Sequence, residues 1–208
     1  MLRQRQVVIN NLWMTDEAWF HLSGYVNAQN TRTWASENPH MFHESPLHPA
    51  KIGVLAAISK KRIFFTFFTE AVNTRNYLSD LFAPFSRSLS EEERSQGWFQ
   101  QDGATAHTSN LALTEIRGVF GNRIISRRTE HPWPARSPDL TAPDFYLWGK
   151  IKGSVYKNNP KTIEDLKTAI SLEINAIDTN ELERVMRNVM KRVKICKAEG
   201  GRHFQHLL

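Results

Sequence analysis

The chain has 208 residues with 27 Lys or Arg and 21 Asp or Glu, and its formal net charge is +6 at pH 7. This length suits one domain, 1–208, large enough to bury roughly 70% of its unfolded surface. The lone Cys196 excludes an internal disulfide framework, and no apolar stretch is long enough to span a bilayer. We therefore expect an intracellular protein with no membrane partner, whose basic balance favours a polyanionic one.

The first predicted element is a strand from Leu12 to Leu22 that carries an acid, Asp16, on an apolar face. Because side chains alternate along a strand, that face would place Asp16 among five apolar residues, Leu12, Met14, Ala18, Phe20 and Leu22. Burying a carboxylate there is costly unless it is compensated, and a divalent cation is an adequate partner. The alternatives are another register, or a strand end that leaves Asp16 in solvent.

The next segments predict mixed α and β structure. Strands are expected at 32–37 (RTWASE), 51–58 (KIGVLAAI) and 63–71 (IFFTFFTEA), followed by a helix from Asn73 to Phe85 and a polar connector at 86–97. The four phenylalanines of the third strand favour a buried strand over a base-stacking surface. Three histidines, His40, His43 and His48, lie in a Pro-rich stretch that favours a solvated loop over a zinc site.

A second acid, Asp102, follows a short aromatic run, WFQQ. The run ends at Gly103, which is typical of a strand that meets a turn, and it would place Asp102 where the sheet edge opens. The alternative is an ordinary Asp-Gly turn in which the Asp bonds its own backbone. A helix from Asn110 to Phe120, closed by Gly121, and a strand at 124–128 (IISRR) are expected next.

A third acid, Asp144, begins an amphipathic helical pattern. It follows Pro143, so one interpretation is a helix start whose acid complements the helix dipole. Asp144 also shares a helical face with three apolar residues, Trp148, Ile151 and Val155, which predicts that it points toward the sheet. Asp139 is the competing candidate, but the sequence SPD around it is typical of a turn without a periodic apolar face. We prefer Asp144.

The C-terminal part is predicted to be helical. Thr162 and Asp165 form a capping pair ahead of one apolar stripe, Leu166, Ala169, Ile170, Ile174 and Ile177. A second stripe contains Leu182, Val185, Met186, Val189 and Val193. Both stripes favour helices that cover the sheet. The second helix also carries six cations that could contact phosphates or form a solvated exterior: Arg184, Arg187, Lys191, Arg192, Lys194 and Lys197.

These motifs, in this order, resemble the catalytic domain of mariner-type DDE transposases in the ribonuclease-H-like superfamily. The likeness runs from about Trp13 to about Phe204 through TDEAWFHLSGYVN, WFQQDGATAHTS, IISRR, PWPARSPDLTAPDFYLWG, VYKNNPKTIEDLK and GGRHF. It implies an α/β fold, a mixed sheet of about five strands flanked by helices, with a helical C-terminal part. In that family the acids lie in the first strand, after the fourth strand and at a helix start after the fifth, which matches Asp16, Asp102 and Asp144.

The resemblance implies metal-dependent DNA strand cleavage and transfer. Asp16 and Asp102 would bridge two Mg²⁺ or Mn²⁺ ions and Asp144 would complete the second site. Hard oxygen ligands suit these ions, and a pair about 3.5–4 Å apart supports in-line displacement at a phosphodiester. Water would cleave a transposon end, and the freed 3′ hydroxyl would attack target DNA. His107 could approach the scissile phosphate, or it could cap a helix that begins near Thr108.

The implied partner is DNA, with a homodimer as an additional expectation, no small-molecule substrate and a nuclear location. The likeness begins almost at the start of the chain, so no separate helix-turn-helix domain is expected. The segment from Phe68 to Trp98 is also shorter than its family counterpart. These departures leave two alternatives open. One is a catalytically inactive, truncated or host-recruited remnant that binds DNA, and the other is an interaction module whose helices dock on a partner.

Overall fold

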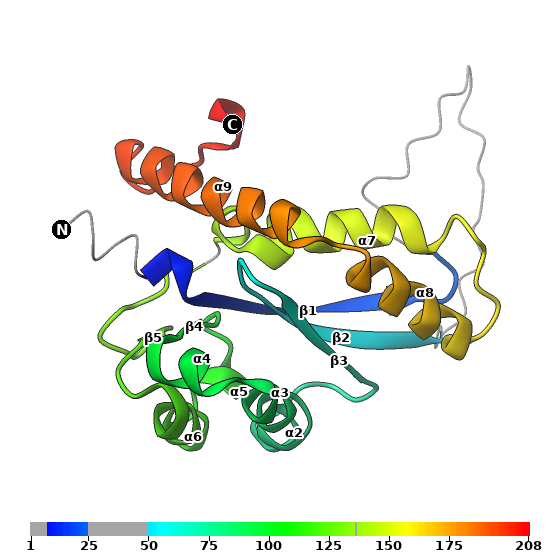
Figure 1. The fold of residues 1–208 in the computed structure, drawn as a ribbon, viewed down its shortest axis with the longest axis horizontal. Helices are drawn as coiled ribbons and strands as arrows, with labels where there is room; N and C mark the ends of the chain where they lie inside the picture. The colour runs from blue at the N-terminus through cyan, green and yellow to red at the C-terminus, as the bar shows by residue number, and fades with distance from the viewer. Residues whose placement is uncertain (1–7, 25–49, 136) are drawn as a thin grey trace, which may run out of the picture.

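The computed structural model describes residues 8–24, 50–135 and 137–208. Its centre is a five-stranded mixed sheet in the order β3-β2-β1-β4-β5 (Figure 1). The strands are β1 (Leu12–His21), β2 (Lys51–Ile58), β3 (Ile63–Phe68), β4 (Trp98–Gln100) and β5 (Ile124–Ile125). The first three pair antiparallel, whereas β4 runs parallel to β1 and β5 parallel to β4. The predicted α/β fold is confirmed.

Strand β1 is the middle strand of the sheet, and both of its faces are covered. Its even-numbered apolar residues, Leu12, Met14, Ala18 and Phe20, belong to one buried cluster. Trp13, on the opposite face, belongs to a second cluster. The alternation predicted from the sequence is therefore confirmed, and the strand ends at His21.

The C-terminal helices cover one face of the sheet (Figure 1). This layer contains the π-helical turn η4 (Pro143–Leu147) and the helices α7 (Trp148–Val155), α8 (Ile163–Asn175) and α9 (Thr179–Ala198). Thr162 and Asp165 form the predicted reciprocal cap of α8. Both predicted stripes pack on the sheet, except that Val193 is 39% exposed.

Shorter helices cover the other face: α2 (Thr74–Asn76), η2 (Tyr77–Phe82), α3 (Ala83–Ser88), α4 (Glu91–Gln96), α5 (Thr105–Thr108) and α6 (Asn110–Phe120). The core on this side is aromatic. Phe99 from β4 stacks on Phe120 with ring centroids 5.2 Å apart, and Trp13 meets Phe85 edge-on at the same distance. Helix α6 ends as predicted at Gly121, whose φ of 60° suits a residue without a Cβ.

Three predicted elements differ from the structure. The connector at 86–97 contains helix α4, because Ser90 and Glu93 cap it reciprocally even though it buries no residue. The phenylalanines of β3 are half-buried and not fully buried, since β3 is an edge strand. Strand β5 has two residues and not five, because the chain turns after it and the Ser126 N–H bonds the carbonyl of His131.

Two further predictions, the strand at 32–37 and the histidine-containing loop, lie outside the described residues. Within the part of the chain that the structure describes, no helix is both long and apolar enough to cross a membrane. Helices η3 (Pro138–Leu140) and η5 (Gln205–Leu207) complete the fold. The first of these leads directly into η4, where Asp144 lies.

Candidate functional site

The register of β1 and β4 brings two of the predicted acids to the same level of the sheet. Met14 lies opposite Gln100 on these parallel strands, and Asp16 and Asp102 each follow two residues later. Asp144 comes from the first turn of η4, which contacts β1. All three acids line one cavity of about 390 Å³. A larger cavity of about 680 Å³ lies along α9 and is lined by none of the three.

Asp16 and Asp144 are neighbouring carboxyl groups whose charges repel each other. Burial raises the pKa of Asp16, and the neighbouring charge of Asp144 raises it further, to about 8. The indole Nε1 of Trp148 donates a 2.7 Å hydrogen bond to Asp16 Oδ2, which opposes this rise. Burial also raises the pKa of Asp144, and the charges of Asp102 and Asp139 add to this rise while the side chains of Asp16 and Thr141 oppose it. Full ionisation of this half of the site is therefore unfavourable without a compensating cation.

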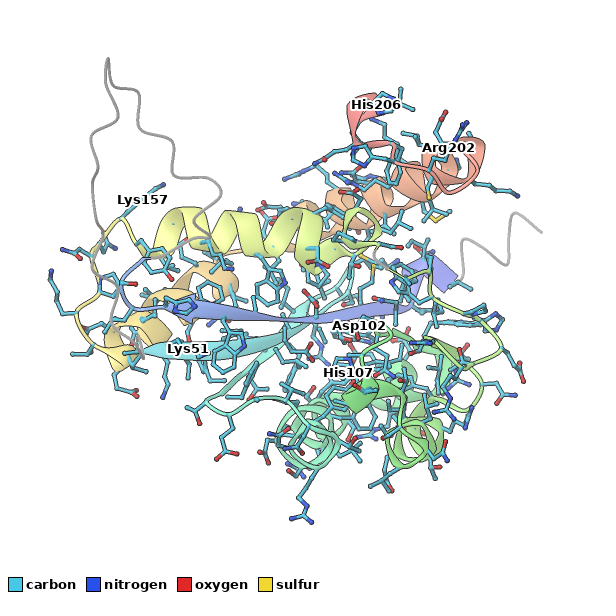
Figure 2. The ribbon with its side chains drawn as sticks, turned by 180° about the vertical axis from the view of Figure 1, so that it is seen from behind. Lys51, Asp102, His107, Lys157, Arg202 and His206 are labelled. Atoms are coloured by element: carbon cyan, nitrogen blue, oxygen red, sulfur yellow. The ribbon has the colours of Figure 1, made fainter. Side chains whose placement is uncertain are left out.

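Asp102 has a different environment. Its Oδ1 accepts hydrogen bonds from the Ala104 N–H at 2.9 Å and from His107 Nδ1 at 2.6 Å. Figure 2 shows Asp102 and His107 side by side below β1. Burial would raise the pKa of Asp102, but the hydrogen bond and charge of His107 hold it below the usual value. This carboxylate is therefore ionised and paired with a cation.

His107 is buried between two acids. Its Nε2 lies 3.2 Å from Glu17 Oε1, while Nδ1 contacts Asp102. Burial alone would lower the pKa of His107, but the hydrogen bonds and charges of Asp102 and Glu17 raise it to about 10. Helix α6 is capped by Ser109, whose side chain accepts a bond from a backbone N–H, so the suggested capping role of His107 is wrong.

The competing acid, Asp139, lies in η3, as its turn pattern predicted, and does not line the cavity. Its backbone carbonyl accepts a 3.0 Å bond from Arg192 Nη1. The structure thus brings Asp16, Asp102 and Asp144 together and leaves Asp139 outside. The assignment of a catalytic role to these three stays a prediction.

Sequence reasoning missed several side chains of the site. Glu17 directly follows Asp16, and the same alternation that directs Asp16 to one face directs Glu17 to the other, where His107 lies. Arg127 and Trp133 line the cavity but come from irregular chain, which has no periodicity to reveal them. Arg127 also lies over Gly103, where an added Cβ would be 3.2 Å from Arg127 Cδ, so a side chain there would require Arg127 to shift.

The donor set fits a hard divalent cation. Among the described residues, no group of three or more His, Cys, Asp or Glu side chains is arranged as a preformed metal site. The three acids nevertheless share one cavity, and two of them repel each other when both are ionised. A bound cation would remove that repulsion, and carboxylate oxygens are ligands that Mg²⁺ and Mn²⁺ prefer.

A curated transposase shares sequence with this chain. No family model matches the chain. The chain is 30% identical over 191 residues to the Tc3 transposase of Caenorhabditis elegans, and the match covers 90% of this chain and 56% of that protein. The chain therefore spans little more than half the length of this relative.

Solved structures of Mos1 transposase share the fold. A paired-end complex with the left transposon end matches at a TM-score of 0.73 and 18% identity, covering 98% of this chain and 59% of that chain. The catalytic domain of Mos1 mariner transposase matches at 0.70 and 19% identity, covering 98% of this chain and 89% of that chain. The predicted ribonuclease-H-like architecture is confirmed. The chain is therefore similar in sequence to the Tc3 transposase and has the fold of the Mos1 mariner transposase catalytic domain.

Proposed function

We propose that this chain cleaves DNA strands and joins them to target DNA, using divalent cations held by Asp16, Asp102 and Asp144. The observation that carries this proposal is the convergence of the three acids on one cavity. Two further findings support it. The homologous Tc3 protein is a transposase, and Mos1 paired-end complexes have been solved with Mn and with Mg.

The acids of the cavity would bind cations, and its basic residue would contact DNA. Bound divalent cations would supply an activated oxygen nucleophile and stabilise the leaving oxygen. Asp16 and Asp144 would act as ligands in their ionised forms, because a cation offsets the burial and the neighbouring negative charge that raise the pKa of each. Arg127 brings a guanidinium to the wall of the same cavity, where it can contact a phosphate of the bound strand.

DNA is the partner that this arrangement favours. The cavity combines oxygen ligands with Arg127 and the indole of Trp133, which offers a flat apolar surface to a base. The cavity along α9 is lined by four further cations, Lys60, Arg187, Lys191 and Lys194, which can contact phosphates without sequence preference. Homodimer formation and a nuclear location stay predictions.

The proposal is tested by strand cleavage in the presence of Mn²⁺ or Mg²⁺. Supercoiled plasmid and a labelled transposon-end duplex report nicking and strand transfer for the wild type, Asp102→Asn and Asp139→Asn. Asp139→Asn is the matched control, since it removes an acid of the same segment as Asp144 that lies outside the cavity. We expect only Asp102→Asn to lose activity. Equal activity in the wild type and Asp102→Asn would end the enzymatic proposal.

The second candidate function is a catalytically silent DNA-binding protein. It is favoured by the net charge of +6 and by the four cations that line the cavity along α9. It predicts duplex binding that weakens steeply with salt and survives replacement of all three acids, with no cleavage by the wild type. Fluorescence anisotropy over a salt series measures the binding, and undetectable binding at low salt would exclude this function.

A further inference from the structure

A chain of three side chains, Glu17, His107 and Asp102, links three parts of the fold. Glu17 comes from β1, His107 from α5 and Asp102 from the turn after β4. The contacts are short: 3.2 Å from Glu17 Oε1 to His107 Nε2, and 2.6 Å from His107 Nδ1 to Asp102 Oδ1. Both ring nitrogens of the histidine are thus used to connect two acids.

The histidine ring is buried and is held by an aromatic contact as well as by the two acids. Its side chain is 6% exposed, and its ring lies against Tyr77 with centroids 4.3 Å apart. The Tyr77 hydroxyl donates a 2.6 Å bond to Gln101 Oε1, and Gln101 Nε2 donates a 2.9 Å bond to the His107 carbonyl. The phenol, the amide and the helix backbone therefore hold the ring in one orientation.

Asp102 lacks comparable packing. Its side chain is 51% exposed, so without a fixed partner the carboxylate would rotate freely in solvent. Both of its side-chain hydrogen bonds within the described residues fall on Oδ1, which leaves Oδ2 available to a cation. The Ala104 N–H and the buried His107 ring are thus the two groups that order this exposed side chain, and only the ring is a side chain.

Strand β1 contributes to both halves of the site through consecutive residues. Asp16 points to the cavity directly. Glu17 points to the opposite face, as alternation along a strand requires, and reaches His107 there. Glu17 also gives His107 a partner on its far nitrogen, which keeps a proton on Nε2 and the ring in place between the acids.

We propose that Glu17 and His107 are positioning residues that hold Asp102 in the orientation needed to bind a divalent cation. This inference rests on the proposed function of the three acids and assigns a task to two residues outside the cavity lining. Neither residue touches the reacting atoms. Their task is to replace the disorder of an exposed carboxylate with a single geometry before the cation and DNA arrive.

The test uses two amide substitutions that each preserve one of the two nitrogen positions. The side-chain nitrogen of Asn can occupy the position of His Nδ1, whereas that of Gln can occupy the position of Nε2. His107→Asn therefore keeps a donor to Asp102, and His107→Gln keeps a donor to Glu17. If His107 served packing alone, His107→Gln would be the milder change, because it retains more volume. Positioning predicts the opposite order.

The first measurement needs neither metal nor activity. Crystal structures of the metal-free wild type and both variants show where the Asp102 carboxylate lies. We expect its orientation to be kept in His107→Asn and lost in His107→Gln. The same orientation of Asp102 in both variants would overturn the inference, whatever the protein does with DNA.

The second measurement is Mn²⁺ affinity, followed by electron paramagnetic resonance, with strand cleavage measured in parallel. We expect affinity to fall about 10–100-fold in His107→Gln and markedly less in His107→Asn. His131→Gln, at an exposed histidine, is the matched control and should bind as the wild type does. Equal or reversed losses would overturn the inference. If the wild type shows no binding that depends on Asp102, the proposed function fails, and the crystal structures still decide the positioning.

Discussion

The two halves of the candidate site differ in the charges that surround their acids and in the direction of the pKa shifts. In the half formed by β1 and η4, Asp16 and Asp144 lie together, and the pKa of each is raised by burial and by negative charge nearby. In the half that follows β4, Asp102 is ionised because His107 lies 2.6 Å away. In the first half two acids face each other, whereas in the second a histidine cation lies against Asp102.

Under the proposed function, this contrast predicts which half gains more from a cation. Two buried acids whose pKa values are raised gain most from a divalent cation, because it offsets the burial and the repulsion that disfavour their ionised forms. Asp102 gains less, because a histidine already supplies positive charge. The first half is therefore expected to contribute most of the affinity for the cation, and the second a carboxylate that is already oriented.

The largest expected effect is on strand cleavage. Asp16→Asn and Asp102→Asn should each lower the rate on the order of 10³-fold, since charge stabilisation by the cation contributes several kcal/mol. A Mn²⁺-dependent nicking assay measures this, with Asp139→Asn as the control that should retain activity. A large loss from only one of the first two substitutions would show that the halves do not act on one reaction.

Cation binding should stabilise the fold. At a Mn²⁺ concentration of about 100 times Kd, the free energy of unfolding should rise by about 2.7 kcal/mol. Thermal melting with and without Mn²⁺ measures the shift, and Asp16→Asn should lose most of it. A shift that survives this substitution would place the cation elsewhere.

The two halves should respond with opposite signs when one acid is neutralised without metal. The pKa of Asp16 is raised from 3.8 to about 8, so the native state holds more protons than the unfolded state between these values. Wild-type stability should therefore fall as the pH rises through this window, and Asp16→Asn should be about 1–3 kcal/mol more stable at pH 8. Asp102→Asn should instead be less stable than the wild type, because it removes one of the two anions that face His107 and leaves only Glu17. Urea unfolding at pH 5 and pH 8 tests both signs.

A smaller effect is expected at the indole that serves the first half. Trp148→Phe removes the Nε1–H that bonds Asp16 Oδ2 at 2.7 Å and keeps most of the aromatic volume. The free energy of unfolding should fall by about 1 kcal/mol. Urea unfolding measures this loss. The side chain of Trp148 donates to Asp16 and not to Asp102, so the substitution tests only the half of the site that contains Asp16.

The smallest effect marks the baseline for surface charge. Lys61 and Glu92 form an exposed ion pair at 3.2 Å, with side chains 46% and 67% accessible. Glu92→Gln should change the free energy of unfolding by less than about 0.5 kcal/mol, because water screens such pairs. A larger change would mean that this exposed ion pair is an unsuitable reference for the substitutions at the site.

Much of the fold followed from local pattern. The alternation of Leu12 to Leu22, the Thr162–Asp165 cap of α8 and the end of α6 at Gly121 are all read within a few residues, and the structure confirms them. The exposure of β3 was not predictable in this way, because a run of phenylalanines has the same local pattern in an edge strand and in a central one. Helix α4 was missed because its stability comes from caps, while its composition is that of a connector.

The sequence by itself determined which acids are unusual. Asp16 lies within an apolar alternation and Asp144 at the start of an apolar helical face, and both features depend only on the geometry of one strand or one helix. Tertiary structure decided that Asp16, Asp102 and Asp144 share a cavity, that Asp16 and Asp144 repel each other, and that Asp102 is held by a histidine bound to Glu17. Periodicity extends only along one element, whereas these contacts depend on how β1 registers with β4 and how η4 packs across them, and electrostatic interactions act through that space and not along the chain.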